Sequence, residues 1–141
     1  MATLFTKIID GDLPGTFVWK DDVCVAFLSI APLSPGHTLV VPRREADHWL
    51  DLDGDELSHI MSVAQTIGRA LQAAYQPVKV GMMVAGLEVP HVHIHVSSIN
   101  AVHDLDFANA DSTATADDLE EAAERIRASL RDMGCEDVFP T

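Results

Sequence analysis

Apolar and polar residues alternate strictly over residues 91–96, His-Val-His-Ile-His-Val. Successive side chains of a β-strand point to opposite faces, so this alternation predicts a strand. Its apolar members would face the core: Val92, Ile94 and Val96. Its polar members would form a row on the other face: His91, His93 and His95. An ordinary half-buried strand with polar residues outside has the same pattern. Three histidines at one period are rare by chance, however, so the row is a candidate functional site.

Shorter apolar runs bounded by turn residues predict four further strands. These strands span residues 16–20, 23–29, 37–41 and 78–84. Asp21 and Asp22 would form the turn between the first two, and Pro42 would end the third. Phe27 and Ile30 would flank a bend at the end of the second strand.

A helical period of apolar residues predicts the main helix, from Asp53 to about Tyr75, with Asp51 or Asp53 as its cap. Its apolar face would comprise Leu57, Ile60, Met61, Ala64, Ile67, Gly68 and Leu71. A short helix capped by Thr3 would run to about Asp10. Its inward residues would be Leu4, Ile8 and Phe5.

The C-terminal third begins with a polar, Asp-rich stretch over residues 100–114 that has no clear period and predicts a mobile loop. Thr115 would cap a last helix over about 117–133, and Gly134 is placed to end it. Hairpins, one long helix and returning strands together predict an α+β fold with an antiparallel sheet. We expect residues 1–141 to form a single domain with one core.

The charge balance narrows the classes of function. Nine basic residues against 22 acidic residues give a net charge of −13. This balance argues against a basic face that binds nucleic acid, and an anionic substrate would need local groups to hold it. No apolar run is long enough to span a membrane, and the N-terminus enters a helical pattern without a signal peptide. Cys24 and Cys135 are too few for a disulfide framework, so we expect a cytoplasmic protein.

The histidine row is open to two chemical interpretations. Two neighbouring imidazoles can converge on one metal ion, since metal–nitrogen distances are about 2.1 Å. The outer two lie about 13 Å apart in an extended strand, so one ion bound by all three would be strained. A larger anion suits the row better, with one imidazole attacking and the others binding or moving protons. We expect no cofactor.

The stretch His91-Val92-His93-Ile94-His95-Val96-Ser97 resembles the His-φ-His-φ-His-φ-φ signature of the histidine triad family, in which φ is hydrophobic; Ser97 departs from it. The resemblance extends over nearly the whole chain and is weakest at the C-terminus. Its other segments are 5–14 (FTKIIDGDLP), 25–32 (VAFLSIAP), 34–42 (SPGHTLVVP) and 86–90 (GLEVP).

The resemblance implies a five-stranded sheet paired into a homodimer, with attack on the α-phosphate of a purine nucleotide or nucleotide conjugate. His93 matches the family nucleophile, which would form a nucleotidyl-imidazole that water cleaves. His95 matches the residue that contacts phosphate and assists the leaving group. His91 matches the one that orients the nucleophile through its backbone carbonyl. A histidine at position 95, where related transferases carry glutamine, favours a hydrolase. His37, in the Pro-Gly-His motif, is expected to be structural.

The resemblance also implies a substrate pocket. Phe27 and Ile30 match residues that line the base pocket, although Phe27 also fits plain core. Gly86 would let the backbone approach phosphate, or would serve as a simple turn glycine. Ser29 stands where many relatives place a ribose-binding acid. Glu88 replaces Ser or Thr and adds negative charge beside the phosphates.

A further position, Leu87, stands where relatives often carry Gln. Zinc-containing relatives place ligands at the positions of Thr3, Thr6 and Glu45, so we expect no structural zinc. The first hypothesis is a hydrolase of nucleoside phosphoramidates or related conjugates. The second is a nucleotide-binding or interaction protein with little turnover, and the third is a metalloprotein that uses two of the histidines.

Overall fold

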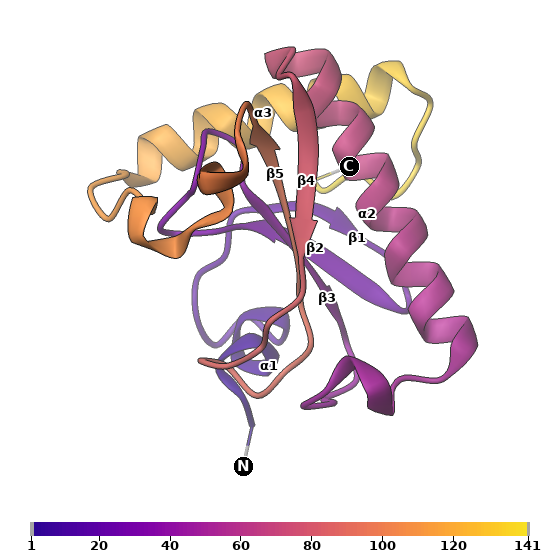
Figure 1. Cartoon of the computed structure of the whole chain (residues 1–141). Coiled ribbons are helices and arrows are strands. Elements are labelled where there is room, and N and C mark those ends of the chain that lie inside the picture. The colour runs from indigo at the N-terminus through magenta and orange to yellow at the C-terminus, as the bar shows by residue number, and fades with distance from the viewer. Residues whose placement is uncertain (1, 141) are drawn as a thin grey trace.

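Three α-helices and five strands make up the computed structural model, which describes residues 2–140 (Figure 1). The strands are β1 (Phe17–Lys20), β2 (Cys24–Leu28), β3 (Thr38–Pro42), β4 (Lys79–Met83) and β5 (Ile94–Ile99). The helices are α1 (Leu4–Ile9), α2 (Gly54–Tyr75) and α3 (Ala116–Asp132).

The five strands form one sheet in the order β1-β2-β3-β5-β4, with every neighbouring pair antiparallel. The α+β class and the five-stranded antiparallel sheet predicted from sequence are thus confirmed. Helices α2 and α3 pack on one face of the sheet over the larger apolar core. Helix α1 lies against the other face, where Phe5 joins a smaller cluster with Phe17, Val25, Phe27, Leu39 and Val41.

Strand β5 is shifted along the chain from its predicted range of 91–96 and runs from Ile94 to Ile99. Residues 91–93 leave the ladder near Pro42, which has no N–H to pair, and the Val92 amide donates instead to the Ala46 carbonyl at 2.8 Å. The far end is longer because β4 pairs with β5 up to Ile99. The prediction that the apolar residues of this stretch face the core is confirmed, because Val92, Ile94 and Val96 all lie in the larger core.

The predicted caps are present at both long helices. Asp53 accepts a hydrogen bond from the Glu56 amide and forms a capping box at the start of α2. Thr115 forms the same arrangement with Asp118 at α3. Met61 was wrongly assigned to the buried face of α2, because its position on the helix turns toward the open edge of the sheet and leaves it 39% exposed.

Two other expectations need correction. Of the three residues of α1 predicted to point inward, Phe5 and Ile8 pack on the smaller cluster, whereas Leu4 is 49% exposed. The stretch 100–114 contains two short 3₁₀ turns, Val102–Leu105 and Phe107–Asn109. Asp104 and Asp106 build these turns with their carboxylates, which accept hydrogen bonds from nearby backbone amides. This Asx chemistry has no apolar period to reveal it.

The two edges of the sheet differ. Along β1, Lys20 donates to the Asp137 carbonyl at 3.0 Å and Trp19 forms a bridge with Val138, so the C-terminal segment covers that edge. β4 is the last strand on the other side, and Met82 there is 47% exposed. None of the described helices is long and apolar enough to cross a membrane.

Candidate active site

All three histidines of the row are buried: Phe5 of α1 lies against the rings of His91 and His93, and Phe107 stands edge-on to His95 at 5.0 Å. His91, His93 and His95 are 0%, 6% and 8% exposed. The ring of Phe5 stands edge-on to His93 with 4.8 Å between the ring centroids, and the His93 and His95 rings are also 4.8 Å apart. Because so little of each ring meets water, the hydrogen bonds around the rings decide which nitrogen carries each proton.

Backbone carbonyls set the protons of His91 and His93. The Nε2 atom of His91 lies 2.7 Å from the Pro42 carbonyl, and Nδ1 of His93 lies 2.7 Å from the His91 carbonyl. A carbonyl oxygen can only accept, so both of these ring nitrogens carry hydrogen. Neutral His93 therefore has its lone pair on Nε2, the nitrogen that a nucleophile needs.

A fourth histidine sets the proton of His95. The Leu33 amide donates to Nδ1 of His37 at 3.0 Å, so the hydrogen of neutral His37 is on Nε2. That Nε2 lies 2.9 Å from Nδ1 of His95 and donates to it. His95 then carries its own hydrogen on Nε2. The chain of bonds thus places a lone pair on His93 beside an N–H donor on His95.

Burial is the main reason why all four histidines are neutral near pH 7. It lowers the pKa of His91 and of His93, although the His91 carbonyl and the charge of Glu88 partly oppose the effect at His93. Burial and the neighbouring histidines lower the pKa of His95 to about 3, and burial with His93 lowers that of His37 to about 4. An anionic phosphate nearby would raise these pKa values again.

The backbone conformation of Gly36 helps to position His37 for its hydrogen bond to His95. Its φ angle is +89°, which glycine adopts without strain, and a Cβ there would lie 2.8 Å from Leu71 and 2.9 Å from Tyr75. The loop before β3 can therefore pack against the C-terminal end of α2. His37 was expected to be structural, and its bond to His95 extends that role into the site. The Pro-Gly-His motif was the available signal, but the sequence does not reveal its partner 58 residues away.

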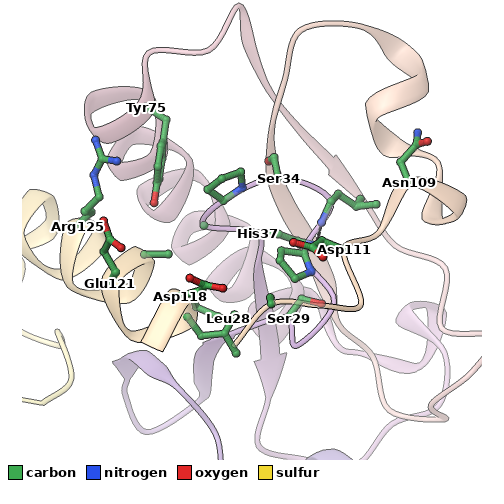
Figure 2. A pocket seen from close by; sticks show the side chains of 17 residues that line it. Leu28, Ser29, Ser34, His37, Tyr75, Asn109, Asp111, Asp118, Glu121 and Arg125 are labelled. Atoms are coloured by element: carbon green, nitrogen blue, oxygen red, sulfur yellow. Dashed lines mark hydrogen bonds between the residues drawn. The ribbon is translucent and has the colours of Figure 1, made fainter. Parts of the chain in front are cut away.

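A cavity of about 520 Å³ lies between the 29–37 loop and α3, and His37 is part of its lining (Figure 2). Asp118, Glu121 and Arg125 of α3 line it, and Ser29 and His37 form part of the opposite wall. Among the described residues, the triad histidines are not part of its lining. Its carboxylates also make it unsuitable for a phosphate.

A comparison with models of known protein families shows to which family the chain belongs. The model of the HIT domain matches residues 10–102 of this chain. The chain belongs to the HIT family.

Relatives in this family agree with that assignment. An uncharacterised HIT-like protein of Borreliella burgdorferi is 36% identical over 100 residues, which cover 66% of this chain and 72% of the relative. An adenosine 5′-monophosphoramidase of Schizosaccharomyces pombe is 31% identical over 97 residues, covering 68% and 73%. The crystal structure of a Zn-bound histidine triad family protein from Mycobacterium smegmatis superposes with a TM-score of 0.81 at 25% identity, covering 95% and 96%. The resemblance stated from sequence is confirmed, and a nucleotide hydrolase is supported at the level of the family.

The substrate residues predicted from the HIT resemblance do not all gather at the triad. Phe27 lies on the same face and contacts Phe5 edge-on at 5.5 Å. Ser29 follows the end of β2 and lines the cavity of Figure 2, and its Oγ accepts from the Ala31 amide at 3.3 Å. Ile30 is 81% exposed and has left the sheet.

Two predicted residues lie in the loop before β5. Gly86 has a φ angle of +71°, so a turn requirement alone accounts for glycine. Glu88 is exposed, and its charge acts on His93.

The positions where the HIT resemblance predicts missing zinc ligands form a hydrogen-bonded cluster. Glu45 Oε1 accepts from the Thr3 amide at 2.7 Å and from the Thr6 hydroxyl at 2.5 Å. The Thr3 hydroxyl lies 2.8 Å from Nδ1 of His91. The sequence predicted Thr3 as the cap of α1, but it gave no sign that Glu45 and His91 would bond to this residue.

One other group of possible metal ligands is found among the described residues. Asp21, Cys24 and His59 place a carboxylate, a thiol and an imidazole within 4.8 Å of one another. Both oxygens of Asp21 are occupied: Oδ1 accepts from the amides of Val23 and Cys24, and Oδ2 accepts from Trp19 Nε1 and His59 Nε2. Burial, followed by the Asp21 charge, raises the pKa of the Cys24 thiol, which keeps it protonated. The group therefore ties the β1–β2 turn to α2.

Proposed function

We propose that this chain hydrolyses a purine nucleoside phosphoramidate or a related nucleotide conjugate at its α-phosphate. The observation that carries the proposal is the hydrogen bond from His93 Nδ1 to the His91 carbonyl, which leaves the Nε2 lone pair of His93 free. Family membership and the phosphoramidase named among the relatives support the same reaction class.

In the proposed reaction, Nε2 of His93 attacks the phosphorus and the bond to the leaving amine breaks, with a proton going to the amine. Water then attacks the nucleotidyl-imidazole, which releases the nucleoside monophosphate and restores neutral His93. The Nε2–H of His95 would donate to a phosphate oxygen or to the leaving group, while His91 orients His93. Phe27, Ser29 and Ile30 are assigned to the nucleoside, and Gly86 and Glu88 to the region around the phosphate.

The bonding around the rings disfavours a metal as the alternative ligand. Both nitrogens of His91 have partners, and Nδ1 of His95 is bonded to His37. Only His93 presents a free lone pair, so two-histidine coordination would require an existing bond to break. Binding with little turnover is the competing function, favoured by serine at position 29, by the exposed Leu87 and by the negative charge of Glu88 near His93.

The test uses purified protein with a panel of fluorogenic adenosine and guanosine phosphoramidates. We expect steady turnover and, in rapidly quenched reactions, a nucleotidyl adduct on His93 by peptide mass spectrometry. His93→Ala should abolish turnover and the adduct while nucleotide binding persists. His103→Ala is the matched control, because His103 is a surface histidine. Binding without turnover in the wild type would instead establish the competing function.

We propose that the chain forms a homodimer through β4 and α2. β4 is the open edge of the sheet, and a groove of about 630 Å³ between β4 and α2 is lined by Met61, Met82 and Val80. An open edge with apolar neighbours is suited to continuing the sheet into a second copy. Light scattering should give the mass of a dimer for the wild type and that of a monomer for Met82→Arg; a monomeric wild type would contradict this interface.

A further inference from the structure

We propose that Thr3 and Glu45 are positioning residues for the triad: Glu45 holds the N-terminus of α1, and the Thr3 hydroxyl locks the His91 ring that orients the nucleophile. The catalytic part of this inference rests on the proposed function. The structural part stands on the hydrogen bonds alone.

The first step is the link between Glu45 and α1. The carboxylate accepts from both the Thr3 amide and the Thr6 hydroxyl, at 2.7 and 2.5 Å. These bonds lower the pKa of Glu45, with the one from Thr6 contributing most, so the carboxylate is ionised. An exposed carboxylate of the segment after β3 thus fixes the first turn of a helix more than 30 residues earlier in the chain.

The second step is that the hydrogen bond between Thr3 and His91 has a defined direction. The Pro42 carbonyl requires hydrogen on Nε2 of His91, so Nδ1 of neutral His91 can only accept. The Thr3 hydroxyl has two acceptors within reach, Nδ1 of His91 at 2.8 Å and the Thr6 hydroxyl at 3.2 Å, and the shorter contact directs its hydrogen to His91. The same oxygen accepts from the Thr6 amide at 3.1 Å, which is the ordinary N-cap bond. One hydroxyl thus serves two functions, and capping alone would need only the second bond.

The third step leads to the nucleophile. The His91 ring is completely buried and is held at both nitrogens, by Thr3 on one side and Pro42 on the other. The backbone carbonyl of the same residue accepts the hydrogen of His93 Nδ1 at 2.7 Å. A ring fixed at two points restrains the backbone that carries this carbonyl. Loss of the Thr3 bond would leave Nδ1 of the buried His91 ring without its side-chain partner.

The experiment separates positioning from capping. Thr3→Gly removes the hydroxyl but costs little as a cap, since glycine is tolerated at the N-cap position. Thr3→Ser restores the hydroxyl, and Glu45→Gln keeps an acceptor while removing the charge. Thr115→Gly is the matched control, because it removes an N-cap hydroxyl of the same kind from α3.

For Thr3→Gly we expect kcat on an adenosine phosphoramidate to fall about tenfold, as for one lost buried hydrogen bond, with KM within about twofold. Thr3→Ser should have a kcat within about twofold of wild type. The kcat of Glu45→Gln should lie between those of Thr3→Gly and the wild type. Thr115→Gly should leave kcat unchanged. An unchanged kcat for Thr3→Gly, or an equal loss for Thr115→Gly, would overturn the proposal.

A second readout does not depend on turnover. In ¹⁵N NMR spectra of the histidine side chains, Thr3→Gly should shift the Nδ1 signal of His91 and weaken the hydrogen bond of His93 Nδ1, while the signals of His37 stay in place. A spectrum identical to that of the wild type would refute the positioning role. If the wild type hydrolyses no nucleotide conjugate, the proposed function fails, and the NMR result still decides whether Thr3 holds His91.

Discussion

Replacing Asp21 by asparagine should destabilise the fold in a way that depends on pH. The carboxylate accepts four hydrogen bonds from nitrogen donors and a longer one from the Cys24 thiol, and its side chain is only 10% exposed. Asparagine has nearly the same size and can still accept from the two backbone amides. It carries no charge, however, and its NH₂ group would face the N–H of Trp19.

The magnitude follows from the pKa of Asp21. Burial raises this pKa, but the hydrogen bonds, led by that from the Trp19 indole, outweigh burial and lower it from 3.8 to about 2. Each pKa unit corresponds to about 1.4 kcal/mol, so the ionised carboxylate contributes about 2.5 kcal/mol to the free energy of unfolding. Because the folded-state pKa is depressed, this stability is present well above pH 3.8 and is lost as the pH falls through about 2.

Urea unfolding of wild type and Asp21→Asn at pH 7 and pH 3 measures the effect. We expect a difference of about 2.5 kcal/mol at pH 7 and about half of it at pH 3, where the wild-type carboxylate retains only part of its advantage. Asp22→Asn is the control, because Asp22 is an exposed carboxylate in the same turn and should change stability by no more than about 0.5 kcal/mol. A difference at pH 7 below about 0.5 kcal/mol, or one that does not shrink at pH 3, would refute the reasoning.

Three further predictions concern the site. Burial lowers the pKa of His93 from 6.5, so kcat/KM should be flat near neutral pH and should fall on the acid side with a midpoint below 6.5; a midpoint above that value would contradict a neutral, buried nucleophile. Ser29→Asp should tighten adenosine monophosphate binding about tenfold, or ~1.4 kcal/mol, by calorimetry, and less for the 2′-deoxy form; equal gains would show that position 29 does not face the ribose. Elemental analysis of protein purified without a metal-affinity tag should find no stoichiometric zinc.

The sequence by itself determined the type and order of the strands and α-helices and most of each apolar face, although it misplaced the ends of β5 and the side chains of Leu4 and Met61. Alternation placed Val92, Ile94 and Val96 in the core, and Asp53 and Thr115 marked the starts of the two long helices. These features are local: strand and helix periods and cap bonds involve residues a few positions apart, so they can be read along the chain.

Only the tertiary structure decided what each histidine does. The bonds that place the ring hydrogens join Thr3 to His91, Pro42 to His91, and His37 to His95, across 88, 49 and 58 residues. The alternation of polar and apolar residues predicts the face of the strand on which a histidine lies. It does not predict which distant donor or acceptor will contact that histidine in the folded chain. Burial acts in the same way, because Phe5 of α1 must cover His91 and His93, and Phe107 must cover His95, before water is excluded and the pKa values fall. The sequence alone shows that the three histidines share one face of a strand. Folding fixes which ring nitrogen carries the hydrogen, and so leaves a lone pair on Nε2 of His93 and an N–H on Nε2 of His95.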